Sequence, residues 1–174
     1  MSQKIKLYIA SSIDGFIATP DMSVKWLDKY NQSGEDFGYK KFIKNIDTQI
    51  LGETTYNQFK EYYDKEEKIH NFIFSKNKTK KDNINNVKFI NQPVKEFITS
   101  LDKKIHKKIW IVGGANIMNQ FLKENLIDEI ILTIMPEILG NGIRLFDNSN
   151  KPATLKLKQS TQYKLGVVEN HYTK

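Results

Sequence analysis

The chain of 174 residues is 39% apolar and 27% charged, which is typical of one soluble domain that is large enough to bury a core. It has no Cys, which excludes disulfides and thiolate sites, and no apolar stretch approaches the roughly 20 residues of a membrane-spanning helix. The N-terminal apolar run meets Asp14 too early for a secretory signal, so we expect a cytoplasmic protein with no membrane partner.

The net charge of +7 is compatible with an anionic partner of any kind, including nucleic acid or a phosphorylated small molecule. The lysines are scattered, however, and the densest patch, residues 75–86, has the Lys/Asn composition of a solvated loop. We therefore expect no nucleic-acid partner. A contact between a phosphate and one or two lysines of this patch stays open.

Apolar residues that alternate or form short runs predict strands in the first half of the chain, at residues 4–10, 48–52, 69–75 and 87–90. Residues 12–27 carry turn signals at Asp14-Gly15 and Pro20-Asp21, and they predict a long loop with a short extended piece. Helical spacing predicts helices over residues 39–46 and 54–63, and the second is expected to bury Tyr56, Phe59 and Tyr63.

In the second half, Pro93 stands at a favoured first-turn position and predicts the start of a helix over residues 93–104. An apolar strand at residues 109–112 stops at Gly113-Gly114, and a helix is predicted from Ala115. A further strand at residues 128–136 ends at Pro136, and two alternating segments, 153–163 and 165–173, predict a terminal antiparallel hairpin.

This order of elements predicts an α/β fold with a mostly parallel sheet. Strands alternate with helices over the first three quarters of the chain, and only the last segments pair antiparallel. Because no internal repeat or linker interrupts the pattern, we predict a single domain over residues 1–174.

Small residues mark the points at which predicted strands pass into helices or loops. Gly113-Gly114 follows one strand, Gly52 with Thr54 and Thr55 follows another, and Ser75-Lys76 follows a third. In parallel sheets, ligands bind at the carboxyl ends of the strands, and glycine lets a phosphate approach the backbone closely. A plain turn also explains Gly113-Gly114, and helix capping also explains the Thr hydroxyls. Together, the three junctions favour an extended phosphorylated ligand such as a dinucleotide.

The segments IASSIDGFIA, FIKNIDTQILGETTY, IWIVGGANIMNQFL and IDEIILTIMPEILGNGIRLF, in this order, resemble the dihydrofolate-reductase-like superfamily. Within it, the chain looks most like small stand-alone bacterial proteins related to the reductase domain of riboflavin biosynthesis. The resemblance covers nearly the whole chain. It implies a three-layer α/β/α fold with a mainly parallel eight-stranded sheet, and a nicotinamide dinucleotide, usually NADPH, across the strand ends.

The resemblance also implies which residues contact this cofactor. The pyrophosphate and nicotinamide side would be lined by Val112, Gly113, Gly114, Ala115, Asn116 and Ile117. A cis peptide between Gly113 and Gly114 is implied as well. The phosphates would be held by Gly52, Thr54 and Thr55, the adenosine end would lie near Ser75 and Lys76, and the nicotinamide would be bordered by Ala10, Ile17 and Ala18.

One cofactor position departs from the family pattern, since Glu53 stands where relatives commonly have Arg. A carboxylate repels a 2′-phosphate but can accept a hydrogen bond from a ribose hydroxyl. Three readings therefore remain: Lys76 and its neighbours supply the positive charge for NADPH, the preference moves to NADH, or Glu53 points into water.

The candidate catalytic residues are Asp14, Trp26, Asp36 and Thr133. Asp14 fits a turn-stabilising role, Trp26 fits either a cleft wall or the core, and Thr133 could contact substrate or simply suit a strand. In dihydrofolate reductases a helix carboxylate orients the pterin, but the matching position here falls near Gly38. Asp36 or Glu35 could replace it, or both are loop charges.

The resulting hypothesis is an NAD(P)H-dependent reductase of a small heterocyclic substrate. The nearest family activity is reduction of the ribosyl group of a phosphoribosylamino pyrimidine, that of the 5-amino-6-(5-phosphoribosylamino)uracil reductase. The alternatives are dihydrofolate reductase activity and a dinucleotide-binding module without turnover. The three His residues show no ligand spacing, so we expect no metal, and the edges of the terminal hairpin lead us to expect a homodimer.

Overall fold

The computed structural model of the chain describes residues 3–65, 68–77, 80, 86–147 and 152–174. The strands are β1 Lys4–Ser12, β2 Phe16–Ala18, β3 Thr48–Gly52, β4 His70–Phe74, β5 Val87–Ile90, β6 Lys108–Gly113, β7 Glu129–Met135, β8 Ile143–Arg144, β9 Lys156–Gln162 and β10 Val168–Thr173. The α-helices are α1 Asp28–Asn31, α2 Tyr39–Ile43, α3 Glu53–Gln58, α4 Lys60–Lys65, α5 Val94–Ser100 and α6 Ala115–Lys123, and single 3₁₀ turns cover η1 Lys25–Leu27 and η2 Lys164–Gly166.

Eight of these strands form one sheet in the order β5-β4-β3-β6-β1-β7-β10-β9. The pairs from β5 to β7 are parallel, while β10 is antiparallel to both β7 and β9. The predicted mainly parallel eight-stranded sheet with a C-terminal antiparallel hairpin is therefore confirmed. Its strands are buried on both faces where helices cover them, which explains the short continuous apolar runs of the sequence.

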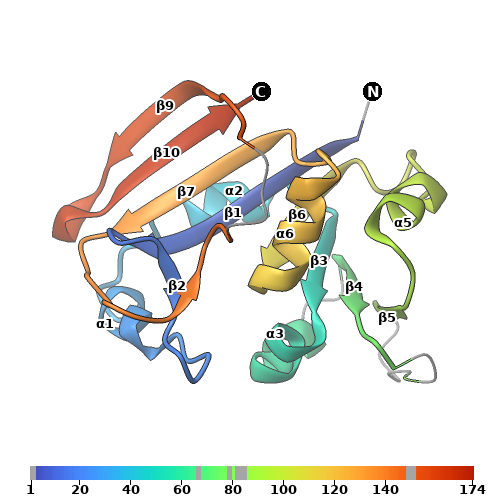
Figure 1. The fold of residues 1–174 in the computed structure, drawn as a ribbon, viewed down its shortest axis with the longest axis horizontal. Helices are drawn as coiled ribbons and strands as arrows, with labels where there is room; N and C mark the ends of the chain where they lie inside the picture. Colours follow the sequence, from blue (N-terminus) through green and yellow to red (C-terminus); the bar gives the residue numbers. More distant parts are fainter. Residues whose placement is uncertain (1–2, 66–67, 78–79, 81–85, 148–151) are drawn as a thin grey trace.

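Helices cover both faces of the sheet, as Figure 1 shows with α6 in front of the sheet and α2 behind it. On the α6 face, α5 and α6 pack their apolar residues against β1, β3, β4, β6 and β7 in the largest core cluster. On the opposite face, α3 and α4 pack on β3, β4 and β5, and α1 and α2 pack on β1, β6 and β7. Trp110 ties α2 to the sheet, because its ring contacts Phe42 edge-on at 5.3 Å and its indole N–H donates to the carbonyl of Tyr8 at 3.0 Å.

Two local expectations need correction. The predicted helix over residues 54–63 is two helices, because Phe59 leaves helical geometry with φ −125° and ψ 27°. Phe59 is consequently 42% exposed, whereas Tyr56 and Tyr63 are buried as predicted. Pro93 is the N-cap of α5 and lies just before the first turn. The short extended piece predicted in the first long loop is confirmed as β2, which pairs with β8 in a small second sheet.

Candidate functional site

The sheet has a topological switch point between β3 and β6. After β3 the chain continues through α3 and α4 on one face towards β4, and after β6 it continues through α6 on the other face towards β7. The carboxyl ends of the two strands are adjacent, since Leu51 pairs with Gly113. Ligands of open α/β sheets bind in the crevice at such a point. Two of the glycine junctions predicted from the sequence therefore meet at one place in the fold.

The turn from β6 into α6 requires glycine at its first position. Gly113 has φ +136°, a conformation that side-chain-bearing residues rarely adopt, and a Cβ built there would meet no atom within 4 Å. The peptide between Gly113 and Gly114 is trans, so the expected cis bond is wrong, and the positive φ of Gly113 turns the chain instead. The open space beside Gly113 fits a ligand that approaches the backbone.

A side-chain hydrogen bond also joins the two junctions. The backbone N–H of Gly114 donates to Oγ1 of Thr55 at 3.0 Å. Thr55 thus neither caps its own helix nor faces open solvent, but holds the turn after β6 against the first turn of α3. Gly114 is itself the N-cap of α6, and no side chain among the described residues caps that helix.

A cavity of about 730 Å³ extends from this crevice across the ends of β3, β4 and β5. Its volume lies within the range of about 300–1,000 Å³ that is usual for cofactor and substrate sites. The predicted cofactor residues that line it are Gly52, Glu53, Thr54, Ser75, Lys76, Asn116 and Ile117. Thr55, Val112, Gly113, Gly114 and Ala115 lie at or beside the junctions but are not part of its lining.

Other lining residues were missed by the sequence analysis, namely Phe74, Ile90, Asn91, Gln92, Pro93 and Gln120. Asn91 is fixed in place, because its side-chain amide donates to the carbonyl of Ser75 at 2.7 Å. The sequence does indicate residues 91–93 as lining residues. They follow the predicted strand 87–90, and the carboxyl ends of parallel strands share one edge of the sheet.

The carboxylate of Glu53 has partners within the protein, although 31% of its side chain is exposed. Its carboxylate accepts a hydrogen bond from Oγ of Ser75 at 2.6 Å and forms an ion pair with Lys80. These partners hold the pKa of Glu53 below its usual range, with the bond to Lys80 as the main cause. The carboxylate is therefore neutralised from within the protein, and Lys76 is left on the cavity wall.

The three residues expected at the nicotinamide end lie on β1 and β2. Ala10 is on β1 and packs against the cluster that contains Met135 and Val167. Ala18 is buried under Gly142, at which a Cβ would collide with the carbonyl of Ala18. Ile17 packs on the edge of the main core cluster.

Asp14 holds two loops together. Its carboxylate accepts hydrogen bonds from Oγ of Ser12 at 2.6 Å, the N–H of Leu139 at 3.1 Å and the N–H of Gly140 at 2.7 Å. The Ser12 bond is the largest cause of its lowered pKa. These contacts match the turn-stabilising reading, with the added finding that the turn is fastened to the loop after β7.

The other candidate catalytic residues lie on the α2 face. Trp26 is partly buried and packs against the cluster of Tyr30, Phe37, Met135 and Val167. Asp36 accepts a hydrogen bond from the N–H of Lys40 at 2.9 Å and so supports the start of α2. Thr133 is 4% exposed on β7 and pairs with Ala10.

Two other classes of site are absent from the part of the chain that the structure describes. No helix there is long and apolar enough to span a membrane. No three or more His, Cys, Asp or Glu side chains gather there in a way that could hold a metal ion.

Comparison with known proteins gives a consistent result. The chain is 37% identical to the uncharacterized protein YwjB of Bacillus subtilis (strain 168), over all of this chain and 99% of that protein. A crystal structure from Shewanella sp. PV-4, named for riboflavin biosynthesis, superposes with a TM-score of 0.86 at 25% identity, over 98% of both chains.

Two further solved structures share the fold. A deaminase/5-amino-6-(5-phosphoribosylamino)uracil reductase from Thermotoga maritima has a TM-score of 0.74 at 14% identity, and the match covers 99% of this chain but 56% of that one. Dihydrofolate reductase from Enterococcus faecalis, complexed with NADP(H), has a TM-score of 0.68 at 14% identity over 98% of this chain and 95% of that one. The model of the RibD C-terminal domain family matches residues 3–168, and the chain therefore belongs to the RibD C-terminal domain family.

Proposed function

We propose that the protein is an NADPH-dependent reductase that acts on a small heterocyclic substrate of the riboflavin pathway type. The observation that carries the proposal is the switch point, where Gly52 and Gly113 end adjacent strands beside a cavity of about 730 Å³. The family supports a reductase, and the Thermotoga maritima neighbour is named for reduction of a phosphoribosylamino uracil.

The residues present fit a dinucleotide. Gly113 leaves open space beside the backbone, and the cavity wall supplies Thr54, Ser75 and Lys76 as polar or cationic contacts for phosphate oxygens. The bound nicotinamide would supply the hydride, so the protein has to align two reactants and exclude water. Ala10, Ile17 and Ala18 would border the reacting end.

The surroundings of Glu53 support a preference for NADPH over NADH. Lys80 pairs with this carboxylate, so the negative charge of Glu53 is neutralised and does not repel a 2′-phosphate. Lys76 lies on the cavity wall, where it can contact that phosphate. NADH stays the weaker alternative. Replacing Glu53 by Gln should increase the ratio of NADPH affinity to NADH affinity, because Lys80 is then left without its anionic partner.

Turnover is tested by NADPH oxidation with 5-amino-6-(5-phosphoribosylamino)uracil, and with dihydrofolate in a parallel reaction. We expect the first substrate to be reduced, at one NADPH per ribosyl group, with uptake of one proton. Oxidation with dihydrofolate alone would establish the other enzymatic activity. Saturable NADPH binding with neither reaction would leave a dinucleotide-binding module, contrary to the proposal.

A homodimer remains a prediction of the same account. β9 is the outer strand of the sheet next to β10, and most of its residues are exposed. Exposed edges of this kind are usually covered. Light scattering at several protein concentrations would give the molecular mass, and a dimer mass is expected if a second copy of the chain covers β9.

A further inference from the structure

Four lysines line a second cavity of about 510 Å³ on the α2 face of the sheet. Lys4 and Lys6 come from β1, Lys41 comes from α2, and Lys108 is the first residue of β6. The cavity volume lies within the range of about 300–1,000 Å³ that is usual for small-molecule sites. A cleft that is lined by charges of one sign concentrates ions of the opposite sign.

Two of these lysines stand directly opposite one another in the sheet. Lys4 of β1 pairs with Lys108 of β6, and neighbouring strands lie about 4.8 Å apart. Both side chains lie on the α2 face, because the next residues, Ile5 and Ile109, belong to the core cluster under α6. Like charges directly opposite one another destabilise a sheet. An anion between the two ammonium groups would remove this repulsion.

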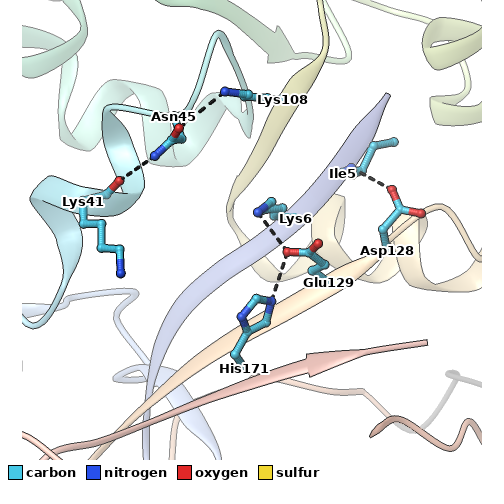
Figure 2. A network of polar contacts seen from close by, with 8 residues as sticks. All are labelled: Ile5, Lys6, Lys41, Asn45, Lys108, Asp128, Glu129 and His171. Atoms are coloured by element: carbon cyan, nitrogen blue, oxygen red, sulfur yellow. Dashed lines mark hydrogen bonds and ion pairs between the residues drawn. The ribbon is translucent and has the colours of Figure 1, made fainter. Parts of the chain in front are cut away.

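The lysines of the cavity differ in the partners that the fold gives them. Among the described residues, Lys6 alone of the four forms an ion pair, with Glu129 at 2.9 Å. The ammonium group of Lys108 reaches only a neutral acceptor, the side-chain oxygen of Asn45, at 3.4 Å. Figure 2 shows both contacts. The charge of Lys6 is therefore neutralised within the protein, and that of Lys108 is not.

Lys4 and Lys41 likewise keep their charge unpaired. Their ammonium groups form no hydrogen bond or ion pair within the described ranges. Glu169 also lines the cavity, and it interacts electrostatically with Lys41 without forming an ion pair among the described residues. Three ammonium groups, those of Lys4, Lys41 and Lys108, thus share a cavity with one carboxylate that could balance them. We call these three lysines the basic cluster.

The other carboxylates at this edge of the sheet are held by the backbone. Asp47 accepts hydrogen bonds from the N–H groups of Lys107 and Lys108 at 3.1 Å and 2.9 Å. Asp128 accepts one from the N–H group of Ile5 at 2.8 Å. Neither carboxylate belongs to the lining of the cavity. The basic cluster therefore has an excess of positive charge for which the described fold shows no use.

The chemistry of the lining suits phosphate. Lysine binds phosphate as a compact point charge, and the lining adds Asn45, Gln159 and Thr161 as neutral hydrogen-bonding groups. The lysines surround one cavity, which favours a compact group with several negative charges. A nucleic-acid backbone would instead match a stripe of basic residues.

We infer that the basic cluster of Lys4, Lys41 and Lys108 binds the phosphate groups of a small anionic ligand. The site is separate from the proposed reaction. Lys4 precedes Ala10 by six residues on β1, and a strand rises about 3.3 Å per residue, so the cluster lies about 20 Å from the strand position that would border the nicotinamide. A ribose phosphate is much shorter than this. The basic cluster is therefore not the place for the phosphate of a substrate that is reduced at its ribosyl group.

Tripolyphosphate serves as the probe, because it is compact and carries several negative charges. Calorimetric titration of the full chain at fixed low salt should show saturable binding, with inorganic phosphate binding more weakly. Lys41→Gln and Lys108→Gln should each weaken tripolyphosphate binding about fivefold or more. The matched control is Lys103→Gln, which removes the same charge from an exposed position outside the lining and should leave the affinity as in wild type.

The repulsion between Lys4 and Lys108 gives a second readout that a purely structural role would not produce. Without tripolyphosphate, Lys108→Gln removes this repulsion, so the urea midpoint of unfolding should stay at the wild-type value or rise. With tripolyphosphate, the wild-type midpoint should rise, because a ligand that binds only the folded state stabilises it. The midpoint of Lys108→Gln should rise less. A lower midpoint in Lys108→Gln, with the tripolyphosphate shift intact, would show a structural lysine and overturn the inference.

Lys76→Gln shows in which cavity the anion binds, because Lys76 lines the proposed cofactor site. Tripolyphosphate binding that is weakened by Lys76→Gln, and not by Lys41→Gln or Lys108→Gln, would place the anion there and overturn the inference. Absence of saturable binding by wild type would overturn it as well. So would tighter binding of a single-stranded oligonucleotide than of tripolyphosphate through the same lysines, since the ligand would then be a nucleic acid.

NADPH affinity measured on the same samples separates this site from the proposed function. NADPH should bind wild type, Lys41→Gln and Lys108→Gln equally. A wild type that binds tripolyphosphate through Lys41 and Lys108 but does not bind NADPH would refute the proposed function and leave the anion site standing. Binding of NADPH without binding of tripolyphosphate would do the reverse.

Discussion

The hydrogen bond between the two strand-end junctions gives the sharpest prediction about the cofactor site. Thr55→Val replaces the hydroxyl by a methyl group of similar size, so the packing is kept and only the acceptor for the Gly114 N–H is lost. Both residues are partly buried, so water satisfies the freed N–H incompletely. An average net hydrogen bond contributes about 1 kcal/mol, and we expect a destabilisation of about that size.

The same substitution should weaken cofactor binding. If the turn at Gly113-Gly114 loses its attachment to α3, about 1 kcal/mol of preorganisation is lost, which corresponds to a roughly fivefold rise in Kd. Urea unfolding measures the first effect and nicotinamide fluorescence the second. Thr55→Ser, which keeps the hydroxyl, is the control for both measurements. Wild-type stability and affinity in Thr55→Val would refute the reasoning.

Three further outcomes follow from the contacts described. Gly113→Ala, at φ +136°, should cost about 1–3 kcal/mol in urea unfolding, and wild-type stability would contradict the assigned turn. Asp14→Ala removes the bonds to Leu139 and Gly140, so limited proteolysis should cut the loop after β7 faster than in wild type. Burial lowers the pKa of His106 from its ordinary 6.5, so the unfolded state binds the proton more readily than the folded state does. The free energy of unfolding, measured with urea, should therefore decline as the pH falls below 6.5. His106→Gln should remove this part of the pH dependence.

The strand and helix order was predictable because it depends on local periodicity. Buried strands such as β3 and β6 are short apolar runs, and α6 has apolar residues at helical spacing. The break at Phe59 was not predictable, since an apolar residue at helical spacing gives no sign that the backbone leaves the helix there. The pairing of β2 with β8 was missed for a different reason, because it joins segments far apart in the sequence.

The lining of the cavity at the switch point was partly predictable from the sequence, and the partners of Glu53 were not. Gly52, Ser75 and Asn116 follow from the rule that ligands bind at strand ends, which needs only the order of the strands. The partners of Glu53, Ser75 and Lys80, come from the segment after β4, so sequence alone left its role open.

The central claim is that the glycine junctions at the switch point hold a dinucleotide. The most direct test is a fluorescence titration of wild type and Gly52→Ala with NADPH and with NADH at fixed salt. A Cβ at Gly52 would make only an ordinary contact with Ile117 at 3.5 Å, so the variant should fold as wild type does. We predict saturable binding with NADPH preferred, and about tenfold weaker NADPH binding by Gly52→Ala at an unchanged urea midpoint. Binding of neither nucleotide by wild type, or full affinity in Gly52→Ala, would contradict the account.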